Sequence, residues 1–146
     1  LNLLLFIHHL PLIFILVFIM QPNIAPRVFL TLPLAIFLIF INSVLYSSTI
    51  GIISSRFRDV EPTIKALMAP MLLLTPVLWK PEMLGEYINY TYLNPFTYFI
   101  GIVRNDLIGA DFDPYIWYGA FFITFLQLAF FMLIYSSKRN RIVFWV

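Results

Sequence analysis

The sequence predicts an all-α, polytopic integral membrane protein with four transmembrane helices and one short helix on the outer face that does not cross. Of its 146 residues, 62% are hydrophobic and only 11% are charged, against about 25% charged residues in an ordinary soluble domain. So few charged side chains cannot cover the surface of a soluble domain of this size. Apolar runs of about 20 residues, the length that crosses a bilayer, alternate with short polar segments. Lipid is therefore the expected surroundings of most of the chain.

The first two apolar runs predict the first two crossings. Residues 3–20 form a span that the turn-rich sequence QPNIAPR closes. Residues 28–53 form the second span, which is too long for an upright crossing and must tilt or protrude. The chain opens with Leu1, inside an apolar run, without an initiator Met or a basic signal-peptide region. We therefore expect residues 1–146 to be a partial transmembrane domain that lacks an N-terminal part.

A proline-containing run predicts the third crossing. Residues 62–79 would make about 27 Å of helix at 1.5 Å per residue, just enough to span. Pro70 and Pro76 lie inside this run and would bend the helix unless neighbouring helices satisfy the freed carbonyls. Residues 80–93 then mix charged residues with tyrosine, which is typical of a segment at the level of the lipid headgroups.

Residues 95–108 predict the helix that does not cross. Asn94 provides an N-cap, Pro95 the first helical position and Gly109 a C-terminal stop. The helix between them is about 21 Å long, which is too short to span the bilayer. Its residues divide into two faces and predict an interfacial or re-entrant helix: an apolar face of Phe96, Phe99, Ile100, Val103 and Leu107, and an opposite face of Thr97, Gly101, Arg104 and Asn105.

The last span covers residues 115–135, and the distribution of charge supports four crossings in total. Cytoplasmic loops of membrane proteins carry an excess of Lys and Arg. With four crossings, six of the nine basic residues share one side, and the opposite side is acidic. A crossing by residues 95–108 would place the basic tail outside, so the rule favours a helix that does not cross. The predicted cytoplasmic residues are Arg56, Arg58, Lys65, Lys138, Arg139 and Arg141, and the acidic ones opposite are Glu82, Glu86, Asp106, Asp111 and Asp113.

The sequence offers no catalytic set and no metal site. It contains no cysteine, and its five glycines form no phosphate-binding loop. His8 and His9 are adjacent, and adjacent helical residues point about 100° apart, unlike metal ligands on one helical face. The two histidines are interpreted as residues near the end of a span or packed between helices, with metal binding or proton relay as the alternative. No cofactor and no nucleic-acid partner are expected.

Three further groups of residues each allow a structural and a functional interpretation. Arg56, Phe57, Arg58 and Asp59 are either a positive-inside anchor or a docking or gating element, because Arg pairs well with the carboxylates of a partner. Arg104 and Asp106 are either interfacial anchors or, at membrane depth, a functional site. The many tyrosines of the outer half form either a headgroup belt or a surface that stacks on sugar rings; Tyr90, Tyr92 and Tyr98 are the candidates for stacking.

The order of several motifs resembles the membrane-spanning permease of type-2 ABC exporters. The sequence ISSRFRDV is followed by a proline-containing span ending in LLLTPVLWKPE, then by LNPFTYFIGIVRNDLIG, a last span and the basic tail SKRNRIVFWV. The closest likeness is to the branch that exports O-antigen, capsular polysaccharide or teichoic acid. The likeness is strong over about the last two-thirds of the chain and generic over residues 1–50.

This resemblance implies a six-span subunit of which the chain supplies spans three to six. Such subunits dimerise around a channel for a lipid-linked polymer in the bacterial inner membrane, and separate ATP-binding subunits bind on the cytoplasmic side. By this likeness residues 94–109 match the outer re-entrant helices, and Arg56, Arg58 and Asp59 lie in a cytoplasmic loop at the base of the channel. Two alternatives are a permease of the same fold for drugs or small lipids, and an integral-membrane transferase that uses His8 or His9.

Overall fold

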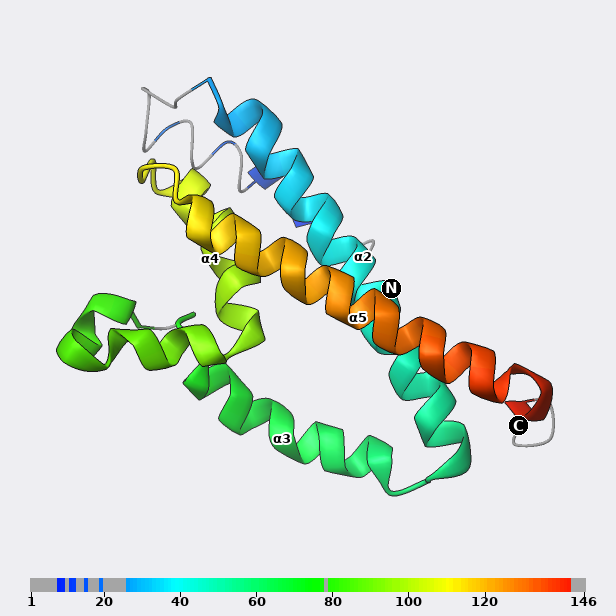
Figure 1. The fold of residues 1–146 in the computed structure, drawn as a ribbon. Coiled ribbons are helices and arrows are strands. Elements are labelled where there is room, and N and C mark those ends of the chain that lie inside the picture. Colours follow the sequence, from blue (N-terminus) through cyan, green and yellow to red (C-terminus); the bar gives the residue numbers. More distant parts are fainter. Residues whose placement is uncertain are drawn as a thin grey trace.

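The computed structural model describes residues 8–9, 11–12, 15, 19, 26–77 and 79–142, and of residues 82 and 138–142 the backbone alone. Within these residues every regular element is a helix, so the predicted all-α class is confirmed. Most of the predicted first span, residues 3–20, lies outside the described residues. The elements, drawn in Figure 1, are α2 (Val28–Arg56), α3 (Val60–Leu74), the 3-10 helix η1 (Pro81–Leu93), α4 (Pro95–Leu107) and α5 (Pro114–Ile142).

Two of these helices, α2 and α5, are long and apolar enough to cross a membrane. Each has 29 residues, or about 43 Å at 1.5 Å per residue. Only 11% of the most apolar part of α5 is buried in the structure, and large side chains such as Phe125 and Leu133 are about two-thirds exposed. The core helix of a soluble protein would bury such residues, so the exposed surface of α5 suits contact with lipid or with further helices.

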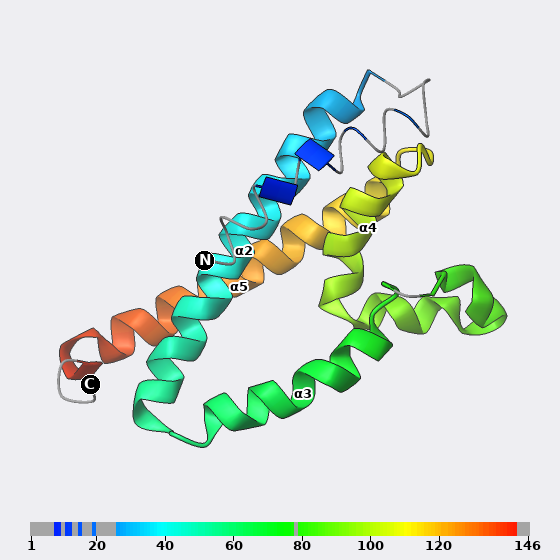
Figure 2. The same cartoon turned by 180° about the vertical axis from the view of Figure 1, so that it is seen from behind.

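The α2–α5 pair is parallel. Two hydrogen bonds join the helices in the same order along both: Asn42 donates to Thr124 and, further along, Gln127 donates to Thr49. Arg27, just before α2, donates to the carbonyl of Ala110, just before α5. Figures 1 and 2 show both helices running from the same end of the molecule to the other. The pair therefore has an acidic end, where α2 and α5 begin, and a basic end, where both helices finish.

Helix α4 packs against the first halves of both long helices and completes the core. The smallest residues of this core, Ala35 and Ala120, are fully buried and let the α2 and α5 backbones approach each other. Ile102 of α4 is the most completely buried large side chain of the described residues, at 1% exposure. The other members of the core are Leu38, Phe99 and Trp117.

The third predicted span differs from a continuous helix over residues 62–79. Helix α3 ends at Leu74, and Thr75 is extended, with φ −93° and ψ 134°. The cause is Pro76, because the proline ring disfavours the helical conformation of the residue before it. Pro70 is accommodated inside α3, whereas Pro76 lies in the turn that follows.

The helical part of this segment is too short to cross by itself. The 15 residues of α3 make about 22 Å of helix, against a hydrocarbon core of roughly 30 Å. The described residues of this linker, 75–77, 79 and 80, contain no α-helix, and a non-helical linker of six residues can span at most about 20 Å. The chain can therefore still reach the opposite surface, with a non-helical segment forming the final part of the path.

The parallel α2–α5 pair predicts which positions share a side of the membrane. In single-cysteine variants, for which residues 1–146 need no background substitution because they contain no cysteine, Arg58→Cys and Ser137→Cys should react with a membrane-impermeant maleimide only after permeabilisation. Asp111→Cys should react in intact cells, because residue 111 precedes α5 at the acidic end. All three positions are exposed.

Labelling of Thr63→Cys, an exposed position beside the same loop as Arg58, is the internal control and should follow Arg58→Cys. Reaction of positions 58 and 137 from opposite sides would contradict a crossing by both helices in the same direction.

Candidate functional site

A helical hairpin formed by η1 and α4 is the most distinctive feature of the subunit. Asn94 joins the two elements, and its side-chain Oδ1 accepts a hydrogen bond from the Phe96 amide at 3.0 Å, while Pro95 occupies the first helical position. At the other end of α4, Gly109 has φ +68°, a left-handed conformation that glycine adopts without strain. The sequence signals for a helix over residues 95–108 therefore correspond to α4 within one residue.

Helix α4 runs along one side of the α2–α5 pair, whereas η1 projects away from the pair (Figures 1 and 2). The Phe96 ring at the start of α4 stacks on Tyr46 of α2, with 6.4 Å between ring centroids. Tyr46 lies well inside α2, 18 positions after its first residue, Val28. The end of α4 lies close to the start of α2, where Asp106 interacts with Thr31. Helix α4 is thus antiparallel to α2, and its first turn packs against the middle of α2.

A buried polar turn holds this first turn of α4 to the end of α3. The Asn94 amide donates to Thr75 Oγ1 at 2.9 Å, and Thr75 donates to the carbonyl of Met71 at 2.7 Å. Thr97 donates to the carbonyl of Thr91 at 2.7 Å. These bonds matter because an unsatisfied polar group costs several kcal/mol in a bilayer, where water does not replace the lost partner.

The two faces of α4 differ from the predicted ones. The buried residues of the helix are Thr97, Phe99, Ile102 and Asp106, so two polar side chains of α4 face the protein. The sequence pattern predicted that the polar residues of α4 lie opposite its buried apolar residues. Thr97 and Asp106 are buried nevertheless, because the Thr91 carbonyl and Thr31, both outside α4, bind their side chains. The difference excludes a helix that presents only an apolar face to the other helices.

A charged contact closes the acidic end of the hairpin. Arg27 Nη2 donates to the carbonyl of Ala110, just after α4, and tethers the end of the hairpin to the start of α2. Asp106 lies in the last turn of α4, and burial raises the pKa of its carboxyl. A hydrogen bond from Thr31 and the charge of Arg27 partly offset this rise. No pattern in the sequence predicts that Arg27 lies near Asp106, because the two residues belong to distant segments.

Three tyrosines from η1, α4 and α5 form a cluster beside the hairpin. The ring centroids of Tyr92 lie 5.9 Å from Tyr98 and 5.4 Å from Tyr115, and those of Tyr98 and Tyr115 are 6.3 Å apart. Two of the predicted stacking residues are thus brought together. Tyr90 is not in the cluster; its ring lies 6.1 Å from Tyr87. Sequence reasoning missed Tyr115 as a partner, since only the packing of α5 brings it close.

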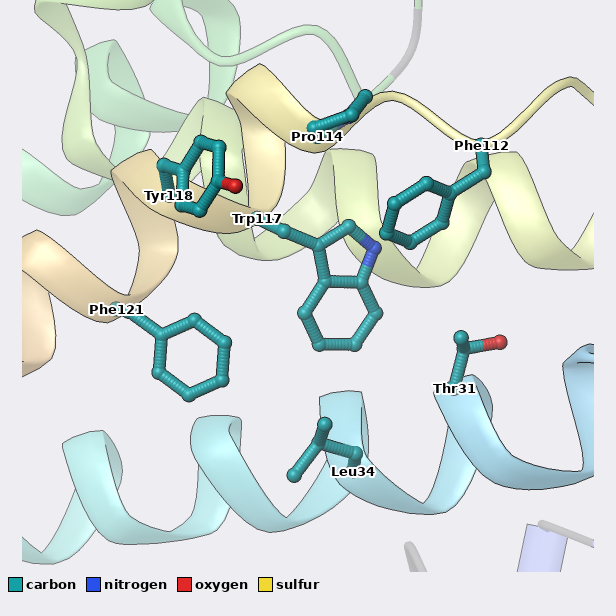
Figure 3. Close-up of a pocket in the computed structure, with 7 residues that line it drawn as sticks. All are labelled: Thr31, Leu34, Phe112, Pro114, Trp117, Tyr118 and Phe121. Atoms are coloured by element: carbon teal, nitrogen blue, oxygen red, sulfur yellow. The ribbon is translucent and has the colours of Figure 1, made fainter.

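An apolar hollow lies between α2 and α5 at the acidic end. Figure 3 shows the Trp117 indole between the rings of Phe112 and Phe121, above Leu34 of α2. The ring centroid of Trp117 is 6.2 Å from that of Phe112 and 6.1 Å from that of Phe121. The hollow has a volume of about 250 Å³, with Thr31, Pro114 and Tyr118 completing its lining.

The predicted loop of Arg56, Phe57, Arg58 and Asp59 connects α2 with α3 at the basic end, and all four residues are exposed. The Arg56 guanidinium lies 5.1 Å from the centre of the Phe57 ring, a distance that suits a cation–π contact. The Phe57 carbonyl accepts from the Val60 amide at 3.1 Å and forms the turn into α3. The backbone of Lys138, Arg139 and Arg141 continues α5 as helix.

A polar seam links α2 with α5 below the hairpin. Asn42 donates to Thr124 Oγ1 at 2.7 Å, and Gln127 donates to Thr49 Oγ1 at 3.4 Å. Asn42, Thr49 and Gln127 are buried. Interhelical hydrogen bonds of this kind contribute roughly 0.6 kcal/mol each in a membrane, so the seam fixes the register of the pair more than it adds to its stability.

His8 and His9 form an exposed pair of side chains. Their rings meet edge to face, with centroids 5.6 Å apart, and both side chains are exposed. Within the described part of the chain, no group of three or more histidine, aspartate or glutamate side chains could hold a metal ion. Neither histidine is brought to the hairpin or to the tyrosine cluster by any described contact.

Together these features define a class of protein: a helical membrane subunit built on a parallel helix pair that holds a helical hairpin. The comparison with protein families specifies it further. The model of the ABC-2 type transporter family matches residues 3–108, so the chain belongs to this family and is a transmembrane subunit of an ABC-2 type transporter. The comparison with curated proteins found no match, and the comparison with solved structures found none either.

Family membership confirms the resemblance at the level of type-2 ABC permeases. It makes the chain a transport component and implies an ATP-binding partner and a dimer. The transferase interpretation of His8 or His9 is therefore not retained.

The packing of Tyr98 on α5 predicts that Gly119 cannot be enlarged. A Cβ at position 119 would overlap Cδ1 and Cε1 of the Tyr98 ring, whereas a Cβ at Gly51 of α2 would meet nothing within 4 Å. We expect Gly119→Ala to lower the stability of the detergent-solubilised protein by about 1–3 kcal/mol, as measured by thermal unfolding. Gly51→Ala, the matched control, should be neutral or slightly stabilising.

Combining Gly119→Ala with Tyr98→Ala should remove the overlap and cost less than the sum of the two single effects. Additive losses would show that the ring does not rest on Gly119.

Proposed function

We propose that this chain is the membrane subunit of an exporter that moves a lipid-linked polysaccharide or polyol phosphate polymer outward across a bacterial plasma membrane. Two copies form the pathway, and separate ATP-binding subunits attach at the basic end, which is cytoplasmic under the positive-inside rule. The chain crosses four times, by residues 3–20, α2, α3 with residues 75–80, and α5. The hairpin of η1 and α4 enters from the outer side and returns to it.

The tyrosine cluster of the hairpin is the observation that supports a polymer as the substrate. Tyr92, Tyr98 and Tyr115 come from three elements, with ring centroids 5.4–6.3 Å apart. Aromatic faces stack on the apolar faces of sugar rings, and a clustered set gives successive sugars equivalent contacts. Because Tyr115 is exposed and Tyr98 is half-buried, the cluster can present a ring face to a passing chain.

The proposed mechanism couples the two ends of the subunit through α3. Helix α3 begins after the loop of Arg56, Phe57, Arg58 and Asp59 and ends at the polar turn that holds α4. Movement of the loop by an ATP-binding partner would therefore displace the base of the hairpin. Pro70 within α3 and Pro76 after it lower the cost of bending at these points. Lys138, Arg139 and Arg141 anchor α5 on the same side.

A second candidate substrate is a drug or a small lipid, and the apolar hollow beside Trp117 favours it. Its volume of about 250 Å³ is slightly below the roughly 300–1,000 Å³ of small-molecule sites. Apolar rings and Leu34 form most of its lining (Figure 3). The two candidates make opposite predictions for the tyrosine cluster, since an apolar substrate gains nothing from sugar stacking.

Replacement of the clustered tyrosines tests the polymer substrate. Tyr98→Leu and Tyr115→Leu should each reduce export of the lipid-linked glycan about two- to tenfold, because a stacking contact is worth roughly 0.5–1.5 kcal/mol. The corresponding Phe variants keep the ring and should retain export. Tyr87→Leu, an exposed tyrosine outside the cluster, is the matched control.

Export would be followed as polymer at the cell surface, normalised to the amount of subunit in the membrane. Normal polymer export by both Leu variants would show that these tyrosines serve only as a headgroup belt. Loss of drug efflux without loss of polymer export would favour the second candidate.

Removal of the loop arginines tests the coupling role. The double variant Arg56→Ala/Arg58→Ala should reduce substrate-stimulated ATPase activity of the reconstituted exporter at least about fivefold, as loss of an inter-site coupling of 1 kcal/mol or more does. Membrane insertion should be unchanged, because the remaining basic residues still mark the cytoplasmic side.

Lys65→Ala is the control for charge alone, since Lys65 is exposed and pairs with Glu61 on α3 at 2.6 Å. Unchanged coupling in the double variant would leave Arg56 and Arg58 as membrane anchors.

A further inference from the structure

A polar cavity lies between η1 and α4, on the side of the hairpin away from the apolar hollow. Its volume is about 290 Å³, near the lower limit of small-molecule sites, which hold roughly 300–1,000 Å³. The space suits one small polar group with its first substituents, and it is too small for a run of sugars. The residues of interest in its lining are Lys80, Thr91, Tyr92, Thr97, Arg104 and Asp113.

The charge of this lining is positive. Lys80, just before η1, and Arg104, in the last turn of α4, contribute two cations to the cavity. The carboxylate of Asp113 also faces it, but its Oδ1 accepts the Tyr115 amide at 2.9 Å at the start of α5, where the helix dipole stabilises negative charge. Among the side chains that the structure describes, the ion pair found is Lys65–Glu61, so neither Lys80 nor Arg104 is held in a described ion pair.

The walls between the two cations are rigid. Thr91 and Thr97 are buried, and their hydroxyls donate to the carbonyls of Ile88 and Thr91 at 2.6 and 2.7 Å. A hydroxyl that donates to a carbonyl keeps a lone pair with which it can accept a hydrogen bond from a protonated ligand oxygen. The same bonds fix the hairpin, so the spacing of η1 and α4 is set before any ligand arrives.

We propose that this cavity binds the phosphate group of an amphiphile, with Lys80 and Arg104 as the two cationic contacts. The planar guanidinium of Arg104 suits two parallel hydrogen bonds to phosphate oxygens, and the Lys80 ammonium supplies a point charge. The phosphate belongs either to the lipid carrier of the exported polymer or to a membrane phospholipid. The first source rests on the proposed function, whereas the phosphate chemistry itself does not.

The test measures binding to the complete exporter, with its ATP-binding subunits, in dodecyl maltoside, a detergent that carries no phosphate. The probe is a short-chain polyprenyl phosphate, and the polyprenol of equal length is the matched ligand without phosphate. Lys80→Gln and Arg104→Gln should each weaken binding of the phosphate about tenfold and leave binding of the polyprenol unchanged. Lys65→Gln, which removes the same charge far from the cavity, should bind like the unaltered exporter.

Arg104→Lys keeps the charge but lacks the planar guanidinium, so its affinity for polyprenyl phosphate should lie between those of Arg104→Gln and the unaltered exporter. Addition of phosphatidylglycerol distinguishes the two sources. Competition between this lipid and the probe, weakened by Lys80→Gln, identifies a phospholipid site, and absence of competition identifies the lipid carrier. Equal affinity of the unaltered exporter, Lys80→Gln and Arg104→Gln for polyprenyl phosphate would overturn the proposal.

Polymer export is measured separately in cells, so the two hypotheses can fail independently. If the exporter moves no polymer but Lys80→Gln and Arg104→Gln weaken phosphate binding, the phosphate site is supported and the polysaccharide function is rejected.

Discussion

The subunit depends on satisfying the polar groups at the junction where α3 ends and α4 begins, beside the helical pair. A bilayer supplies no water to replace lost hydrogen bonds, so irregular backbone is tolerated only where protein groups take their place. Here α3 ends at Leu74 and α4 begins at Pro95, and the side chains of Thr75 and Asn94 join the two ends by a 2.9 Å hydrogen bond. Thr97, bound to the carbonyl of Thr91, closes the same turn.

The rest of the architecture follows from this anchored interruption. Because the base of the hairpin is fixed, α4 can run back to the acidic end along one side of α2 and α5, where Arg27 binds the carbonyl of Ala110. The hairpin in turn positions Tyr98 against Gly119 and places Arg104 opposite η1. The tyrosine cluster and the polar cavity share Tyr92, and both depend on the same turn.

Local signals in the sequence predicted the helices α2, α4 and α5 closely, but not η1, the end of α3 or the assembly of the helices. Asn94 and Gly109 marked both ends of α4, and the alternation of apolar and charged segments marked the helical class. The early end of α3 also had a local cause, Pro76, but the continuous apolar run obscured it. Tyr115 could not be assigned to the cluster, nor Asp106 to its contacts with α2, because these partners lie on other helices and no spacing along the chain encodes them.

The depth of the turn at Asn94 tests the account most directly. Spin labels at Leu93, at Phe122 of α5 and at Phe112 before α5 occupy exposed positions, and collisional relaxation by oxygen and by a polar nickel complex reports their depth in the reconstituted exporter. Leu93 and Phe122 line the same hollow, so we expect both labels at the same depth within the hydrocarbon core, with Phe112 nearer the headgroups. A label at Leu93 that lies at headgroup depth with Phe112 would contradict a hairpin that enters the membrane.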